Sequence, residues 1–341
     1  MEYGAIDLHM RRSQIRIVEE DGRVVLDRRI DTTRRAFSEL FGGRAPLRIL
    51  VEASTEAEWV AQCLEALGHT VIVADPNYAL MYGQRTRRVK TDLRDTAALA
   101  EACRLGIYRA VHRVSADQWR ERQRQTVRQQ LVRQRTGLIN VCRALLRQEG
   151  YRLRGGEAET IEARLTDVAL SAPLEAILAP IRAVLQQLTA RLRELDAAAR
   201  VRAQADPIVR HLMTAPGVGP IVALTFRAVL DTPTRFHGNA QRVAAYLGLV
   251  PREASSGERQ RKGHITKVGP PVLRALLVQS AWTLWRSRRT EAQGLRGWAD
   301  ALAARRGRRI AVVALARRLA RMLYAMWRDG TVFRPRLRAA A

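Results

Sequence analysis

Four acidic residues in the first hundred positions have the types and spacing expected of a metal site. Asp7 lies in a predicted first strand, and Glu52 ends a predicted buried strand, LRILVE. Asp92 and Asp95 stand at i and i+3 in KTDLRDT, which places both carboxylates on one face of a starting helix. Carboxylates that converge repel one another unless cations lie between them, and their hard oxygens suit Mg²⁺ or Mn²⁺. The set predicts a divalent-metal site, where two ions about 4 Å apart activate an attacking oxygen and stabilise a leaving one at phosphorus.

Each of these acids also has an ordinary structural explanation. An Asp in the first turn of a helix usually caps the helix or interacts with its dipole. A single Glu after a strand is usually solvated. The conjunction of all four, each at a position where an α/β sheet places functional groups, favours the metal site.

A second group of residues with chemical potential lies in PREASSGERQRKGHITKVG, residues 251–269. Ser255 and Ser256 precede a glycine there, and a serine acts as a nucleophile when a base or nearby charge activates it. Five cations of the segment can bind a phosphate and stabilise charge that develops on it: Arg252, Arg259, Arg261, Lys262 and Lys267. Taken alone, the segment fits better with a solvated basic loop that only grips a nucleic-acid backbone.

A glycine-rich turn, APGVGP, connects two predicted helices after residue 208. In a helix–hairpin–helix, glycines such as Gly217 and Gly219 let backbone N–H groups meet a phosphate without reading sequence. Tight turns need glycine in any case, so the motif is weak evidence by itself.

The elements that must position the acids alternate between strand and helix. Apolar patterning predicts strands at 3–8, 14–18, 23–30, 47–52 and 71–74, and helices at 33–41 and 56–67. An antiparallel opening followed by parallel crossovers gives a mixed sheet with helices on its faces. The ribonuclease-H-like fold has this order, although the order alone does not exclude other α/β folds. We assign residues 1–115 to this domain.

The middle of the chain, 116–206, is predicted to be a long helical, coiled-coil-like connector. Gly155-Gly156 marks a turn between two helices, and Pro173 and Pro180 mark breaks or helix starts. An a/d stripe runs through Leu178, Ile181, Leu185, Leu188, Leu192 and Leu195. The stripe can pack within one chain as an antiparallel helical pair or between subunits, and we expect it to contribute to an oligomer. Residues 207–330 read as a mainly α-helical domain and 331–341 as a basic tail.

The charge balance points to a nucleic-acid partner. The chain has 59 Lys+Arg against 33 Asp+Glu, a net charge of +26, and such an excess attracts polyanions through counterion release.

The three cysteines, Cys63, Cys103 and Cys142, are widely spaced, which fits reduced thiols in a cytosol. No run of 18 apolar residues and no basic-then-apolar leader is present, so we expect neither a membrane span nor a secretory signal.

A series of motifs runs in order from about residue 3 to 330. The N-terminal ones are GAIDLH, VEAS, ADP and KTDLRD; the C-terminal ones are APGVGP, RFHGNAQRVAAYLGLVPREASSG and GHITKVGPPVLRALLVQSAW. Together they resemble one family of insertion-sequence transposases, the DEDD-type recombinases guided by a bridge RNA. One small departure is Ser54-Thr55 after Glu52, where many relatives have Thr-Gly.

The resemblance implies a mechanism, which composition alone does not indicate. A ribonuclease-H-like domain would bind Mg²⁺ or Mn²⁺ through Asp7, Glu52, Asp92 and Asp95, and Ser256 would be the nucleophile. The two domains would form a composite site between subunits of a tetramer, or dimer of dimers. Donor and target DNA would exchange strands through a phosphoserine link and a four-way junction, guided by a structured noncoding RNA. The resemblance also implies a bacterial or archaeal protein of the cytoplasm, associated with the nucleoid.

Two other functions remain open on the sequence. One is a hydrolytic nuclease of the Holliday-junction-resolvase type, in which Ser256 only contacts phosphate. The other is a non-catalytic nucleic-acid-binding protein derived from a transposase. A covalent protein–DNA adduct would separate the recombinase from both.

Overall fold

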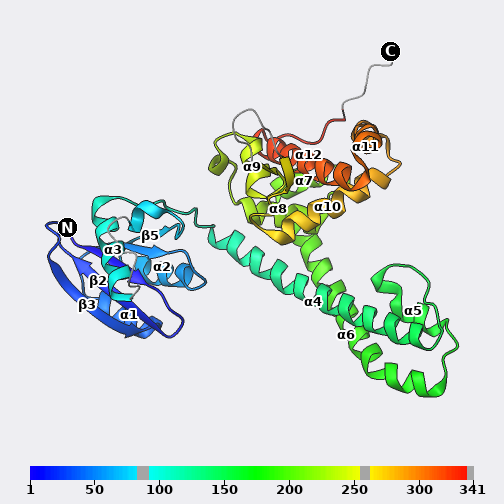
Figure 1. Cartoon of the computed structure of the whole chain (residues 1–341), viewed down its shortest axis with the longest axis horizontal. Helices are drawn as coiled ribbons and strands as arrows, with labels where there is room; N and C mark the ends of the chain where they lie inside the picture. Colours follow the sequence, from blue (N-terminus) through cyan, green and yellow to red (C-terminus); the bar gives the residue numbers. More distant parts are fainter. Residues whose placement is uncertain (83–91, 254–261, 336–341) are drawn as a thin grey trace, which may run out of the picture. The chain divides into compact units, whose positions relative to one another are not determined.

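The computed structural model describes residues 1–82, 92–253 and 262–335 (Figure 1). The chain divides into two compact units, Met1–Arg113 and Val114–Ala341. The first is built around a mixed sheet with helices on its faces, and the second is mostly helical.

The sheet of the first unit has five strands in the order β3-β2-β1-β4-β5. The strands are β1 (Tyr3–Asp7), β2 (Arg12–Val18), β3 (Val24–Asp31), β4 (Arg48–Glu52) and β5 (Thr70–Ala74). β1, β2 and β3 form an antiparallel meander, whereas β4 runs parallel to both β1 and β5. The predicted mixed sheet is therefore confirmed, with each predicted strand within two residues of its observed bounds.

Helices cover both faces of this sheet (Figure 1). They are α1 (Arg34–Phe41), α2 (Ala57–Ala66), the 3-10 turn η1 (Ala79–Tyr82) and α3 (Asp92–Leu105). α1 begins after Thr33, whose side-chain oxygen accepts from the Ala36 amide, as an N-cap does. Gly68 follows α2 with a φ of +91°, the left-handed conformation that glycine adopts after a helix.

The two faces have separate apolar cores because side chains alternate along each strand. Phe37 of α1 and Val60 of α2 pack against one face, and Leu99 and Cys103 of α3 pack against the other. The Cys103 thiol donates to the Arg48 carbonyl at 3.4 Å. Burial raises the pKa of this thiol to about 12, so it is protonated at neutral pH.

The second unit begins with a pair of long helices. They are α4 (Ala116–Gln148) and α6 (Ala172–Ala205), joined by η2 (Ala158–Thr160) and α5 (Ile161–Thr166). Arg128 binds Asp196, and Arg202 donates to the buried Glu121 at 3.0 Å. The earlier residue of α4, Glu121, pairs with the later residue of α6, Arg202, so the two helices run antiparallel.

The leucine stripe of α6 faces the chain's own α4. Leu178 and Leu185 are fully buried in one core with Ile139 and Cys142 of α4. This part of the seam is therefore filled within the chain, as in the intrachain alternative, and the contribution of the stripe to an oligomer stays a prediction. Heptad spacing indicates that a helix packs against another helix, but it does not indicate whether the second helix belongs to the same chain.

Proline had different effects at its two positions in α6. Pro173 lies in the first turn, as predicted for a helix start, whereas Pro180 lies inside the helix and does not break it. Proline removes one backbone hydrogen bond, and the packing of Leu178 and Leu185 on α4 keeps the helix continuous.

The remaining helices surround α12. They are α7 (Pro207–Met213), α8 (Pro220–Leu230), η3 (Pro233–Phe236), α9 (Ala240–Tyr246), α10 (Pro271–Arg286), η4 (Thr290–Ala292), α11 (Gln293–Arg306) and α12 (Arg308–Arg328). Leu315, Leu319 and Leu323 recur every four residues on α12 and are buried in the core of this bundle. Tyr324 on the same helix donates its hydroxyl to the Pro233 carbonyl at 2.9 Å.

Two short strands interrupt the helices where a loop was expected. β6 (Pro251–Glu253) and β7 (Lys262–Ile265) pair in antiparallel fashion. Their sequences, PRE and KGHI, lack the apolar alternation that predicts a strand. In the described residues, no helix combines the length and apolar character needed to cross a membrane.

Candidate functional site

The two central parallel strands direct Asp7 and Glu52 to the α3 face of the sheet. Ala5 of β1 and Leu50 of β4 both pack in the core beneath α3. Side chains two positions apart lie on the same face of a strand. Asp7 and Glu52 follow these two residues by two, and each is the last residue of its strand.

The strand register brings the two acids next to each other. β1 and β4 are hydrogen-bonded neighbours, with Ile6 opposite Val51. Asp7 and Glu52 are the next residue along each strand, and adjacent strands lie about 5 Å apart. Both side chains are half-buried at the same edge of the sheet.

Helix α3 brings the other two acids to the same face. Asp95 lies one helical turn before Leu99 and two turns before Cys103, and both of these residues pack on the sheet. Asp95 itself is 9% exposed. Asp92 begins the helix, and its carbonyl accepts from the Thr96 hydroxyl at 2.6 Å. The predicted i, i+3 placement on a starting helix is therefore observed, with Asp95 directed inward and Asp92 half-exposed.

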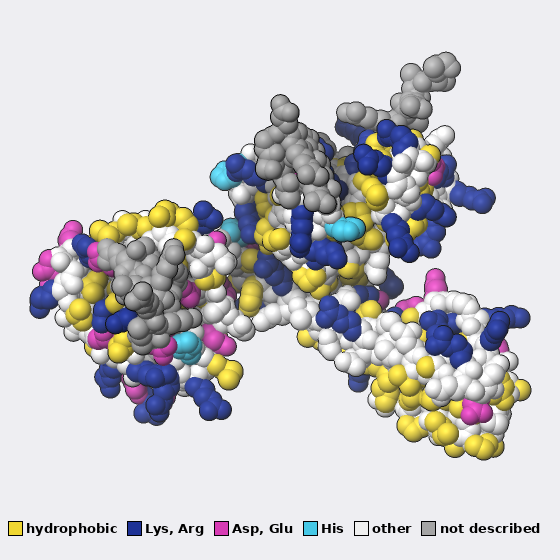
Figure 2. All heavy atoms as spheres, viewed as in Figure 1, with side chains coloured by type: hydrophobic (Ala, Val, Ile, Leu, Met, Phe, Trp, Pro, Cys, Tyr) yellow, Lys and Arg dark blue, Asp and Glu magenta, His cyan; other side chains and the backbone are white. Residues whose placement is uncertain are grey.

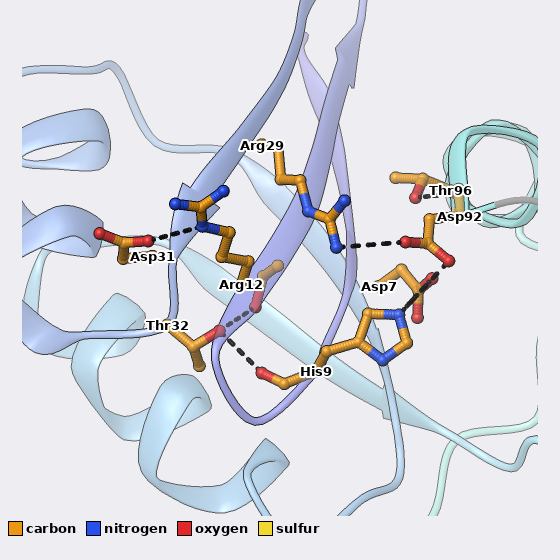
Figure 3. A network of polar contacts seen from close by, with 9 residues as sticks. Asp7, His9, Arg12, Arg29, Asp31, Thr32, Asp92 and Thr96 are labelled. Atoms are coloured by element: carbon orange, nitrogen blue, oxygen red, sulfur yellow. Dashed lines mark hydrogen bonds and ion pairs between the residues drawn. The ribbon is translucent and has the colours of Figure 1, made fainter.

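Among the residues that the structure describes, possible metal ligands come together in a cluster of Asp7, His9 and Asp92, which does not include Glu52 or Asp95 (Figure 3). His9 Nε2 lies 3.5 Å from an oxygen of Asp7 and 3.5 Å from Oδ1 of Asp92. One ligand atom from each of the three lies within 4.8 Å of the others. Carboxylate oxygens and an imidazole nitrogen at such separations form a donor set for a divalent cation.

Arg29 of β3 orients one of these acids. Its guanidinium lies 3.6 Å from Oδ2 of Asp92, so the two oxygens of Asp92 face different partners (Figure 3). The Asp7 side chain is only 13% exposed, against 43% for Asp92 and 50% for His9. The cluster is accessible from solvent on the His9 and Asp92 side.

Sequence reasoning missed His9. The signal was present in IDLH, because His9 follows Asp7 by two positions and period two places both on one face. A single histidine near a strand end is common, however, and only the approach of α3 shows that its ring meets Asp92.

The predicted nucleophile and two of its neighbouring cations, Ser256, Arg259 and Arg261, lie outside the described residues, as does Ser255. The β6–β7 hairpin borders this segment on both sides. Arg252 is exposed on β6, Lys262 begins β7, and the exposed Lys267 follows it. The strand pairing brings the two ends of the segment together.

Two glycines allow the backbone segments at the base of this hairpin to pack closely against each other. Gly248 and Gly269 have φ values of +65° and +78°, the left-handed region that favours glycine. A Cβ on Gly248 would overlap the backbone of Val268, and one on Gly269 would overlap the carbonyl oxygen of Tyr246. No larger residue fits either position without moving backbone.

Arg274 of α10 ties the same two segments together. Its guanidinium donates to the carbonyls of Leu247 at 3.1 Å and Val268 at 3.0 Å. We call Gly248, Gly269 and Arg274 the hairpin clasp. The clasp anchors both strands of the hairpin to the helical bundle.

The turn between α7 and α8 has a packing role. Gly217 has a φ of +80°, and a Cβ there would lie 2.6 Å from the carbonyl oxygen of Ser280 on α10. Gly219 precedes α8, and a Cβ on it would meet open space. The close approach to α10 explains the glycine at 217, while Gly219 leaves the start of α8 accessible.

Basic and aromatic side chains gather on the last two helices. Figure 2 shows many basic side chains in the region of α11 and α12, and all of the basic residues in these two helices are arginines. Arg318 lies 4.8 Å from the ring centre of Trp298, which is 37% exposed. An exposed aromatic ring with arginines around it is typical of a surface that binds nucleic acid.

Comparison with known proteins covers both units. Residues 209–295 match the profile of the transposase IS116/IS110/IS902 family, and residues 5–150 match a DEDD transposase profile of the IS110 type. A probable family 20 transposase of Pseudomonas aeruginosa is 32% identical over 336 residues, which cover 97% of this chain and 98% of that relative. The transposase for insertion sequence element IS1111A of Coxiella burnetii is 28% identical, over 91% of this chain and 85% of its own.

A third relative is the transposase for insertion sequence element IS1328 of Yersinia enterocolitica. It is 26% identical over 96% of this chain and 97% of its own length. The matches thus extend across the acid cluster, the long helices and the hairpin. The chain belongs to the IS116/IS110/IS902 family of transposases.

Proposed function

We propose that this protein is a DNA transposase of a mobile insertion sequence, which cuts and rejoins element and target DNA. The observation that supports the proposal is the approach of Asp7 and Asp92 at the α3 face of the sheet, in a chain of this family. The net charge of +26 supports DNA as the partner.

We assign Asp7, Glu52, Asp92 and Asp95 to a divalent-metal site in a ribonuclease-H-like domain. The donor set fits Mg²⁺ or Mn²⁺, because carboxylate oxygens of Asp7 and Asp92 approach each other from β1 and α3. A bound ion would supply Lewis acidity at a phosphoryl oxygen. Asp7 and Asp95 are held by the sheet and the core of α3, so they would keep their positions without reorganisation when DNA binds.

Ser256 is the proposed nucleophile. Its hydroxyl oxygen would form a bond to a DNA phosphorus while the bond from that phosphorus to a deoxyribose oxygen breaks. The serine proton would pass to a base and the departing oxygen would take up a proton, leaving a free DNA hydroxyl. A hydroxyl of another strand would later attack the phosphoserine and release the enzyme.

The cations around this segment would bind the reacting phosphate. Arg252 lies on β6 and Lys267 follows β7, and Arg259, Arg261 and Lys262 complete the basic set. Glu253 and His264, on β6 and β7, are the candidate bases nearest in sequence. The acid cluster of the same or another subunit is the alternative activator.

We further propose a division of labour along the chain. Residues 1–115 hold metal, 116–206 connect and associate subunits, 207–330 carry Ser256, and 331–341 form a basic tail. In a tetramer, subunit contacts would use the outer faces of α4 and α6, where Val141, Ile177 and Val184 are exposed. A structured bridge RNA would choose donor and target by base pairing, so the protein itself would contact mainly backbone, including at Gly217 and Gly219.

The test is to trap the full-length protein on a nicked suicide DNA substrate and to locate any nucleotide adduct by mass spectrometry. We expect the adduct on Ser256. Ser256→Ala should lose both adduct and recombined product while it keeps its melting temperature and nucleic-acid binding, and Ser255→Ala is the matched control with milder effects. Cleaved DNA without attached protein would replace this mechanism with that of a hydrolytic nuclease.

A further inference from the structure

We propose that His9 is a third ligand of the divalent ion held by Asp7 and Asp92, and that its imidazole favours Mn²⁺ over Mg²⁺. The inference rests on the metal site proposed above and adds a nitrogen donor to the four acids. It concerns the ion that the site selects.

The separations within the cluster fit a shared ion better than direct hydrogen bonds. His9 Nε2 lies 3.5 Å from Asp7 and 3.5 Å from Asp92, whereas a strong N–H···O bond is about 2.7–3.2 Å long. Two ligands that each bond one ion at about 2.1 Å, at angles of roughly 90–110°, lie about 3.0–3.5 Å apart. A single nitrogen that is equally distant from two carboxylates has the arrangement of a co-ligand.

The backbone of His9 is fixed by the neighbouring strands. The His9 carbonyl accepts from the Thr32 hydroxyl at 2.7 Å, and that hydroxyl also lies 2.8 Å from the Ser13 hydroxyl (Figure 3). The Thr32 amide donates to the Arg11 carbonyl at 2.9 Å. These bonds hold the turn after β1 in place, so the imidazole would lose little freedom when it binds an ion.

Asp92 is also prepared for this arrangement. Arg29 lies 3.6 Å from one oxygen of Asp92, and His9 lies 3.5 Å from the other. The guanidinium thereby directs Oδ1 of Asp92 toward the imidazole and Asp7. Ligands whose outer partners fix them in this way commonly hold metal more tightly.

The nitrogen donor has consequences for which ion is bound. Mg²⁺ prefers an all-oxygen octahedral shell. Mn²⁺ shares the preference for carboxylates, but as a transition metal it accepts an imidazole nitrogen more readily than Mg²⁺ does. Removal of His9 should therefore weaken Mn²⁺ binding more than Mg²⁺ binding. The fall in Mn²⁺ affinity should be about tenfold or more, since even partners outside the ligand shell contribute about 10–100-fold.

Pulsed electron paramagnetic resonance of the full-length protein with one equivalent of Mn²⁺ is the test. Coordinated imidazole gives the bound Mn²⁺ a ¹⁴N coupling, which we expect in the wild type and not in His9→Gln. His211→Gln, on α7 in the second unit, is the matched control and should keep the coupling. Titrations of both variants with Mn²⁺ and with Mg²⁺ give the ratio of affinities.

The outcomes separate this inference from the proposed function. Mn²⁺ that binds in an Asp7-dependent way without ¹⁴N coupling overturns the role of His9 and leaves the acid site standing. Failure of the wild type to bind Mn²⁺ or Mg²⁺ overturns both. Equal losses of Mn²⁺ and Mg²⁺ affinity in His9→Gln, with the coupling present in the wild type, would retain the ligand and overturn the selectivity.

Discussion

At the scale of single residues, Asp7 is the most enclosed member of the cluster of Asp7, His9 and Asp92. Its side chain is 13% exposed and lies at the end of a central strand, so its position depends little on surface loops. Asp92 and His9 complete the cluster from α3 and from the turn after β1. A substitution of Asp7 is therefore the most direct way to remove the proposed metal site.

We predict that Asp7→Asn abolishes the stabilisation of the protein by divalent metal. A ligand that binds only the folded state at 100 times its Kd stabilises it by about 2.7 kcal/mol, so Mn²⁺ should raise the melting temperature of the wild type and leave that of the variant unchanged. Without metal, the variant should melt at the same or a higher temperature, because the amide removes repulsion from Asp92.

Differential scanning fluorimetry with and without Mn²⁺ makes this measurement. Asp27→Asn is the control, because Asp27 pairs with Arg16 on the same sheet and its loss should leave the metal response intact. A metal-dependent rise in Asp7→Asn equal to that of the wild type would refute the assignment.

At the scale of elements, the β6–β7 hairpin depends on the clasp formed by Gly248, Gly269 and Arg274. The hairpin strands are short and exposed, so they bury little apolar surface of their own. Their orientation is instead set by backbone crossing and by two hydrogen bonds from α10. The clasp thus connects the segment that contains Ser256 to the rigid bundle.

We predict that Gly269→Ala reduces recombination by at least tenfold although it leaves Ser256 unchanged. The added Cβ would overlap the Tyr246 carbonyl oxygen at a left-handed φ, and strain of this kind costs about 1–3 kcal/mol. The hairpin should shift, and a shift of about 1 Å at a reacting group can cost a hundredfold in rate.

Gly297→Ala is the matched control for this substitution. Gly297 lies within α11 and a Cβ there would meet nothing within 4 Å, so alanine should stabilise the helix by about 0.5–1 kcal/mol. Strand-exchange assays with both variants decide the matter. Full activity of Gly269→Ala would show that the clasp does not position the hairpin.

At the scale of the whole molecule, charge is the dominant property. Some of the positive charge lies where a helix dipole disfavours it. Arg308 and Arg309 begin α12, and the first turn of this helix has no acidic residue. Cations at a helix N-terminus are repelled by the helix dipole. An anion bound near this end of α12 would offset the repulsion, which agrees with the basic surface of α11 and α12 (Figure 2).

We predict that nucleic-acid affinity falls steeply with salt and that Arg309→Ala flattens the dependence. Each phosphate contact contributes about 0.9 to the slope of log K against log salt, so the variant should lose about one unit of slope equally for all sequences. Arg191→Ala is the control, because Arg191 is already paired with Glu194. Affinities measured by fluorescence anisotropy from about 50 to 200 mM salt test this, and a flat wild-type response would contradict it.

Local sequence patterns were enough to predict the strands of the first unit and the positions of its candidate acids. Apolar alternation and glycine positions predicted every strand of the mixed sheet, because period and turn residues are local properties. Placement of Asp7 and Glu52 two residues after buried Ala5 and Leu50 follows from the same alternation. The i, i+3 spacing of Asp92 and Asp95 likewise needed only the geometry of a helix.

Which of these local features lie side by side depended on the packing of elements that are far apart in the sequence. The pairing of β1 with β4 and the packing of α3 bring Asp92 beside His9, a contact between residues 83 positions apart that no local pattern records. The leucine stripe of α6 showed that a partner helix exists, and only the fold identified it as α4 of the same chain. The β6–β7 hairpin escaped prediction because backbone crossing and Arg274 hold it, rather than an apolar pattern of its own.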